Sequence, residues 1–187
     1  MNAHVPARNR QVRALVIAFG VGSLIAVGLG VYGSTHEPTF FALNVAGFSS
    51  GIAAKAWLAT GAAALAIVQV LTASRMWGKL RRVVPLPFAT AKRIHRWSGR
   101  IAVLLTLPVF FHCVTMLGWK TPDARVTAHV VAGSFVYGVL AAKLLVIRWK
   151  AYPHWVLPVL GGSLAAVLAT LWLTSALWYF TNVRFGF

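Results

Sequence analysis

Five long apolar stretches dominate this sequence, and each is long enough to cross a lipid bilayer as one helix. A transmembrane helix needs about 20 mostly apolar residues, because the hydrocarbon core is about 30 Å thick. Segments with charges or helix breakers separate the stretches. The sequence therefore predicts an all-α integral membrane protein, with a four-helix core (helices 2–5) and a peripheral first helix. The five predicted transmembrane helices span about 12–34, 52–74, 93–118, 125–147 and 155–181.

The composition argues against a soluble protein. Of the 187 residues, 59% are hydrophobic and 11% are charged, whereas soluble domains are about 25% charged. A chain of this length forms one unit, so we expect a single membrane domain over 1–187. The first apolar stretch is longer than the apolar part of a signal peptide, about 7–15 residues, so we interpret it as a retained first span.

The basic residues are distributed unequally between the two ends of the predicted bundle. The chain has 18 Lys and Arg against 2 Asp and Glu, and most of the cations lie near the N-terminus, in 75–100 or in 148–150. The positive-inside rule then predicts a cytoplasmic N-terminus and an external C-terminus. This asymmetry accounts for most of the net charge of +16, so nucleic-acid binding is not needed to explain it. It predicts a multi-pass protein of a bacterial cell (inner or plasma) membrane, with anionic lipid at the basic loop.

Two of the six histidines lie well inside predicted spans, where a polar group is costly and indicates function. Counted from the short turn between the third and fourth spans, His112 and His129 are both about 9–10 Å deep at 1.5 Å per residue. His95 begins the third span from the other side, and His154 begins the fifth span at the same level. The sequence therefore predicts two level pairs of histidines, one in each leaflet. We expect His36 to be solvated.

The spacing also predicts which way these histidines point. His95 and His112 are 17 residues apart, which at about 100° per residue separates them by roughly 100° around one helix. They therefore face different neighbours. The stretches "HRWSG" and "HVVAG" repeat the pattern H-x-x-x-G, which places Gly99 and Gly133 one turn from a histidine on the same face. A glycine there leaves room for a flat macrocycle.

These patterns favour haem iron as the partner of the imidazoles. One alternative is that each histidine forms only a hydrogen bond between helices. Zinc or copper held by imidazole is another, although no carboxylate is expected at that depth. The single cysteine, Cys113, excludes a disulfide framework and covalent haem attachment through Cys-x-x-Cys-His within this chain.

The segments "HRWSG" and "HVVAGSFVYG" resemble cytochrome b561 proteins and related bis-histidine membrane cytochromes. The resemblance covers about 52–181 and implies two haem b groups held by a four-helix core. It maps His95, His129 and His154 onto three of the ligands. The remaining ligand of that family lies on the second span, which has no histidine here, so His112 would take its place. The chain also resembles uncharacterised five-span membrane proteins of actinobacteria.

The sequence thus predicts a dihaem b-type cytochrome that carries electrons by outer-sphere transfer, with a single haem as the alternative. The predicted ligand pairs are His95 with His154 and His112 with His129. The predicted cationic contacts of the haem propionates are Arg96, Arg100, Lys143 and Arg125. Its partner would be a redox protein or a quinone, and membership of a larger membrane complex stays open.

Two other functions compete with this prediction. One is a haem-free membrane subunit that docks or anchors a redox complex, and the other is a quinol or metal reductase. An electron-transfer protein is favoured over a stand-alone enzyme. A transporter is disfavoured, because the five spans show no inverted repeat.

Overall fold

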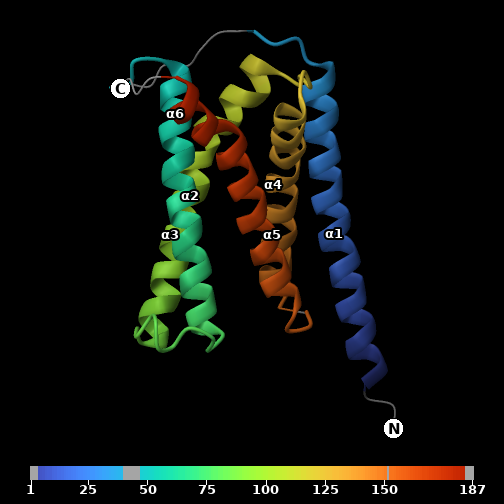
Figure 1. Cartoon of the computed structure of the whole chain (residues 1–187). Coiled ribbons are helices and arrows are strands. Elements are labelled where there is room, and N and C mark those ends of the chain that lie inside the picture. The colour runs from blue at the N-terminus through green and yellow to red at the C-terminus, as the bar shows by residue number, and fades with distance from the viewer. Residues whose placement is uncertain (1–3, 40–46, 151, 184–187) are drawn as a thin grey trace.

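A computed structural model of the chain describes residues 4–39, 47–150 and 152–183, and these residues form helices joined by short segments (Figure 1). Two of the long helices continue as π-helices, labelled η1 and η2, and the last one ends in a short α-helix. The elements are α1 (His4–Thr35), α2 (Gly51–Met76), α3 (Phe88–Phe111), η1 (His112–Leu117), α4 (Ala124–Trp149), α5 (Val156–Leu171), η2 (Trp172–Leu177) and α6 (Trp178–Asn182).

Five helices of the described chain are long and apolar enough to cross a membrane, which confirms the predicted fold class. They cover 9–35, 51–76, 88–117, 124–149 and 156–182. α1 begins at His4, before its predicted start at 12. Among the membrane-length spans, the largest difference from the prediction is the third, which begins at Phe88 and not at 93. Pro87 immediately precedes its first turn, where a missing N–H costs nothing. The additional turn, 88–92, ends in the basic residue Lys92 beside Arg93, so apolar length alone could not predict it.

The helices run alternately up and down, so the segments between them gather at two ends (Figure 1). The N-terminal end of α1, the segment 77–87 and the turn before α5 share one end, which we call the basic end. The segment 36–39, the turn 118–123 and α6 share the opposite end. The structure therefore groups the basic segments as the sequence predicted. Which end faces the cytoplasm stays a prediction.

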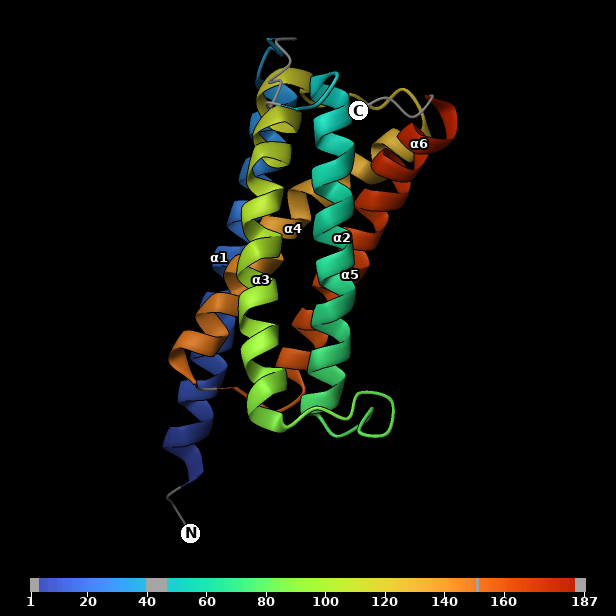
Figure 2. The ribbon, with the colours of Figure 1, turned by 90° about the vertical axis from the view of Figure 1, so that its left-hand side faces the viewer.

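The bundle is built from two closely packed helix pairs and a fifth helix that bridges them. α2 packs along α3, and α1 packs along α4, while α5 and η2 contact both α4 and α2 (Figure 2). In this arrangement α1 lies outside the group formed by α2, α3, α4 and α5, as expected for a peripheral first helix. The space enclosed by those four helices contains the candidate site described below.

Small residues allow α1 and α4 to approach closely. A Cβ atom added to Gly22 would lie 2.6 Å from the carbonyl oxygen of Gly138, and 3.1 Å from Cβ of Ala142. A Cβ atom added to Gly138 would meet Gly22 and Ala26. The two helices thus pair through small residues four apart, a common device in membranes. Most buried apolar residues of the described chain are alanines, while many Leu, Ile and Val side chains are exposed, as expected for surfaces that face lipid.

The opposite end is closed by contacts between the end of α1 and the turn after η1. The Trp119 N–H donates to the Gly33 carbonyl at 2.9 Å, and the indole of Trp119 covers Gly33. His36 stacks on Tyr32 with ring centroids 4.9 Å apart. Its Nε2 lies 3.3 Å from the Thr115 carbonyl oxygen. His36 was expected to be solvated. It is instead half-buried, and it helps to fasten α1 to η1.

Candidate functional site

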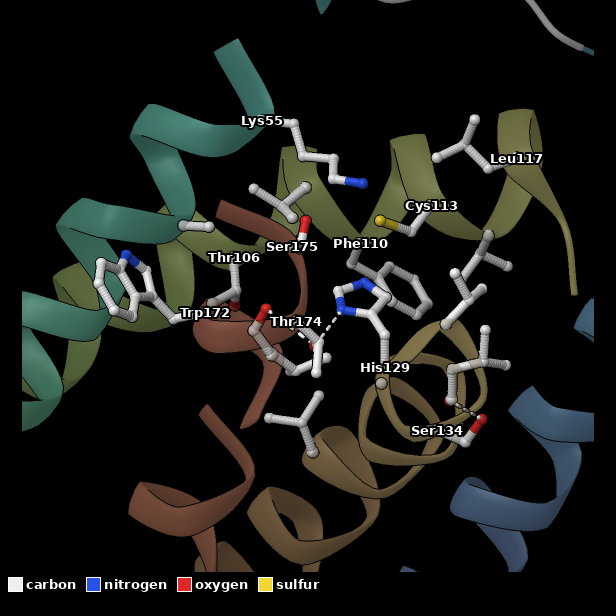
Figure 3. Close-up of a pocket in the computed structure, with 18 of the residues that line it drawn as sticks. Lys55, Thr106, Phe110, Cys113, Leu117, His129, Ser134, Trp172, Thr174 and Ser175 are labelled. Carbon is white, nitrogen blue, oxygen red and sulfur yellow. Dashed lines mark hydrogen bonds between the residues drawn. The ribbon is translucent and has the colours of Figure 1, made fainter. Parts of the chain in front are cut away.

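A cavity of about 430 Å³ lies among α2, α3, α4 and α5 near the opposite end of the bundle. Cavities of about 300–1,000 Å³ are typical of sites for small molecules and cofactors. Most of the lining is apolar, and a few polar groups converge on it. Figure 3 shows the His129 ring inside the cavity, with the Lys55 ammonium and the Cys113 thiol pointing toward its free edge. We call it the His129 cavity.

The two π-helices form part of the wall of the His129 cavity. η1 contributes Cys113, and η2 contributes Thr174 and Ser175. A π-helical turn widens a helix and is frequent at functional sites. Pro108 lies in the last turn of α3, four residues before η1. Because proline lacks an N–H, it removes one α-helical hydrogen bond from this region.

A threonine on a neighbouring helix determines which ring nitrogen of His129 carries the proton. Nδ1 of His129 lies 3.0 Å from Oγ1 of Thr174. The same hydroxyl donates its only proton to the Thr170 carbonyl at 2.5 Å, so it must accept from the imidazole. His129 therefore carries its proton on Nδ1. Its Nε2 keeps a free lone pair and has no hydrogen-bond partner among the residues that the structure describes.

His95 is held in the same way in the other half of the bundle. Its Nδ1 lies 3.0 Å from Oγ1 of Thr72 on α2, and Thr72 donates its proton to the Val68 carbonyl at 2.6 Å. The Nε2 lone pair of His95 is therefore also free. Two histidines on different helices, at different depths, thus share one tautomer and one orienting device. Metal-bound histidines commonly have such a second hydrogen bond, which fixes the ring and the tautomer.

A lysine accompanies each of these histidines. The charge of Lys55 on α2 acts on His129, and the charge of Lys143 on α4 acts on His95. Nζ of Lys143 reaches α5, where it lies 3.9 Å from the position that a Cβ atom would take at Gly161. Both lysines are partly buried within membrane-length helices, where cations are rare and usually functional.

The two other predicted ligands, His112 and His154, lie in surroundings that differ from those of His129 and His95. His112 is 4% exposed, and neither of its ring nitrogens has a hydrogen-bond partner in the described chain. His112 does not line the His129 cavity, although its neighbour Cys113 does. Both residues lie on η1, and the side of η1 that carries Cys113 faces the cavity. His154 lies in the turn before α5 and is exposed, whereas His95 contacts Thr72.

The two predicted glycines have different surroundings. Gly133 lines the His129 cavity, as expected for a glycine beside a bound molecule. A Cβ atom added to Gly99 would lie 3.2 Å from the side-chain oxygen of Gln69, so this glycine makes room for the Gln69 amide on α2. That amide donates to the His95 carbonyl and to the Ser98 hydroxyl. Gly99 therefore serves the packing of α2 against α3 and does not border an open space.

The four cationic residues predicted to contact haem propionates lie in different places. Arg125 lines the cavity, but its guanidinium already donates to the Thr174 carbonyl at 2.6 Å and lies over the Trp178 ring. Arg100 lies over the Trp97 ring with 4.9 Å between Cζ and the ring centroid, and Arg96 is exposed. Two of the four thus lie near a tautomer-fixed histidine, Lys143 near His95 and Arg125 near His129.

Sequence reasoning missed the residues that complete the two sites. Thr72 and Thr174 are 23 and 45 residues from their histidines, so no local motif reveals them. Lys55 is among the few basic residues of the opposite end, and from the sequence it was considered only for its contribution to the charge of that end. The structure shows its side chain entering the cavity (Figure 3).

The fold and the site define a multi-pass helical membrane protein with an apolar cavity that holds one imidazole. In the described chain, no group of three or more His, Cys, Asp or Glu residues is placed to hold a metal ion by side chains alone. The chain belongs to the DUF6529 family, a family of unknown function, whose model matches residues 15–187. No curated protein and no solved structure matches it.

Proposed function

We propose that this chain is a membrane electron-transfer protein that binds haem b in the His129 cavity, with Nε2 of His129 as an axial ligand of the iron. His95 would hold a second haem in the other half of the bundle. Haem supplies one-electron chemistry when it is bound, through the Fe²⁺/Fe³⁺ couple. The observation that carries the proposal is the pair of tautomer-fixed imidazoles with free Nε2 lone pairs.

The surroundings of His129 fit a flat, largely apolar group. The walls of the cavity are mostly apolar, and Gly133 leaves its part of the α4 wall without a side chain. The threonine hydroxyl keeps the Nδ1 proton in place and makes Nε2 a better donor to iron. At the end of the cavity near α6, basic side chains including Lys55 and Arg125 can compensate negative charge. The chain thus provides a ligand, apolar walls and positive charge.

The proposal revises the predicted ligand pairs. A bis-histidine site in the cavity would need His112, which is buried and does not line the cavity, and one at the basic end would need His154, which is exposed. We therefore assign one histidine to each haem. The resemblance to cytochrome b561 remains a prediction, because the matched family has no known function.

The test is the haem content of the purified protein and of four single variants. Pyridine haemochrome analysis should show b-type haem in the natural chain. His129→Ala and His95→Ala should each remove about half of it if two haems are bound. His112→Ala and His154→Ala should retain the full amount and act as matched histidine controls. A colourless natural protein, produced under haem-sufficient conditions, would contradict the proposal.

A quinol-binding protein is the second candidate, and the tautomer of His129 favours it. Nε2 can only accept a hydrogen bond, while the Lys55 ammonium on the same cavity can only donate. A hydroquinone has hydroxyl groups that can donate to Nε2 of His129 and accept from the Lys55 ammonium. Solvent extraction of purified, haem-free protein would test this candidate. Recovery of stoichiometric isoprenoid quinone, lost in His129→Ala, would support it.

A further inference from the structure

Among the residues that the structure describes, Lys55 is a cation without a counter-ion. It lies near the start of α2, within a membrane-length helix, and Figure 3 shows its ammonium directed into the His129 cavity. In the part of the chain that the structure describes, its ammonium forms no hydrogen bond and no ion pair. A charge in such a place is normally paired or faces a water-filled space.

The acidic side chains of this protein do not provide the missing counter-ion. There are only two, Glu37 and Asp123. Asp123 caps α4 by accepting from the Val126 N–H at 2.8 Å, and it faces Arg125 at 3.8 Å. Glu37 is exposed in the segment after α1, and no ion pair joins it to a described residue. The described residues therefore leave Lys55 without a counter-ion, and a bound molecule with an anionic group would supply one.

Arg125 cannot take over this role without losing contacts that it already makes. Its guanidinium is shared among the Thr174 carbonyl, the Asp123 carboxylate and the Trp178 ring. Lys55 has no such contacts, and its charge acts on His129. A bound molecule that meets the Nε2 nitrogen of His129 therefore lies within reach of the Lys55 charge.

We propose that Lys55 binds a carboxylate of the molecule that occupies the His129 cavity. This inference rests on the proposed function where that carboxylate is a haem propionate. A long-chain fatty acid presents the same group on an apolar body and is the other source. A charge-assisted hydrogen bond is roughly twice as strong as a neutral one and needs close geometry. Lys55 would thus fix the orientation of the bound molecule.

The first arm of the experiment measures the rate of haem loss to excess apomyoglobin from the full-length protein in detergent. Lys55→Met should lose the haem of the His129 cavity about tenfold faster, while Lys55→Arg should stay within about twofold of the natural chain. Lys92→Met is the matched control, because Lys92 is exposed near the basic end. Reconstitution with haem dimethyl ester, which lacks the carboxylates, should speed loss from the natural chain and leave Lys55→Met unchanged.

The second arm measures palmitate binding to haem-free protein by equilibrium dialysis, with hexadecanol as the ligand that lacks the carboxylate. Binding that weakens about tenfold in Lys55→Met, with hexadecanol unaffected, would assign the site to a fatty acid. If no variant binds haem, the proposed function fails and this arm alone decides the inference. If haem binds but Lys55→Met changes neither haem loss nor palmitate binding, the inference is overturned and the proposed function stands.

Discussion

Nδ1 of His129 on α4 lies 3.0 Å from Oγ1 of Thr174 on η2, and this contact determines which nitrogen of the imidazole is free. Thr174 can accept from the ring only because its own proton is engaged by the Thr170 carbonyl. The same relationship holds between His95 and Thr72 at the other end of the bundle. The two imidazoles therefore share one tautomer, with Nε2 free in each.

Replacing Thr174 with valine tests the orienting role directly. The change preserves the shape of the side chain and removes the acceptor for the Nδ1 proton. We expect about 10–100-fold weaker retention of the haem at His129, because second hydrogen bonds to metal-bound histidines contribute about this much. The measurement is the rate of haem transfer to apomyoglobin.

Thr170→Val is the control for that experiment. Its hydroxyl donates to the Ala166 carbonyl and lies one turn from Thr174, and no hydrogen bond joins it to the imidazole. Haem retention in this control should match the natural chain. Equal retention in Thr174→Val and Thr170→Val would show that Thr174 does not orient a ligand.

Carbon monoxide distinguishes one axial histidine from two. Because the described structure places His129 in the cavity without His112, the iron held there should have an exchangeable sixth position. We therefore expect the dithionite-reduced protein to give a CO difference spectrum with about one CO per haem at His129. His112→Leu should leave this spectrum unchanged. A protein that binds haem and rejects CO would support the original bis-histidine prediction.

The close crossing of α1 and α4 predicts a strong effect of a single methyl group. Gly138→Ala would place a Cβ atom against the Gly22 backbone and the Ala26 side chain. The backbone of α1 cannot yield locally, so we expect a loss of about 1–3 kcal/mol in the free energy of unfolding, as for other overpacked sites. Unfolding in detergent, followed by circular dichroism, measures it.

Gly28→Ala provides the matched glycine substitution, since nothing lies within 4 Å of the added Cβ atom. It should be neutral or stabilise the helix by up to about 1 kcal/mol, because alanine favours a helix over glycine. If both variants unfold alike, the close approach of α1 and α4 does not contribute to stability.

The distribution of basic residues predicts the orientation in the membrane. In a Cys113→Ser background, a cysteine in place of exposed Lys79 at the basic end should be protected from a membrane-impermeant maleimide in intact cells. A cysteine in place of exposed Glu37 should react. Both should react after the cells are opened. The reverse pattern would place the N-terminus outside and contradict the positive-inside interpretation.

The sequence alone determined the five spans, the grouping of the basic segments and the depth of each histidine. These properties are local, since apolar length sets a span and a rise of about 1.5 Å per residue sets depth. Only the tertiary structure decided which side chains meet, because that depends on how each helix is rotated about its axis. Because of the rotation of the helix that α3 and η1 form together, Cys113 lines the cavity and His112 does not. The packing of η2 and α2 supplied Thr174 and Thr72, which no spacing rule connects to His129 and His95.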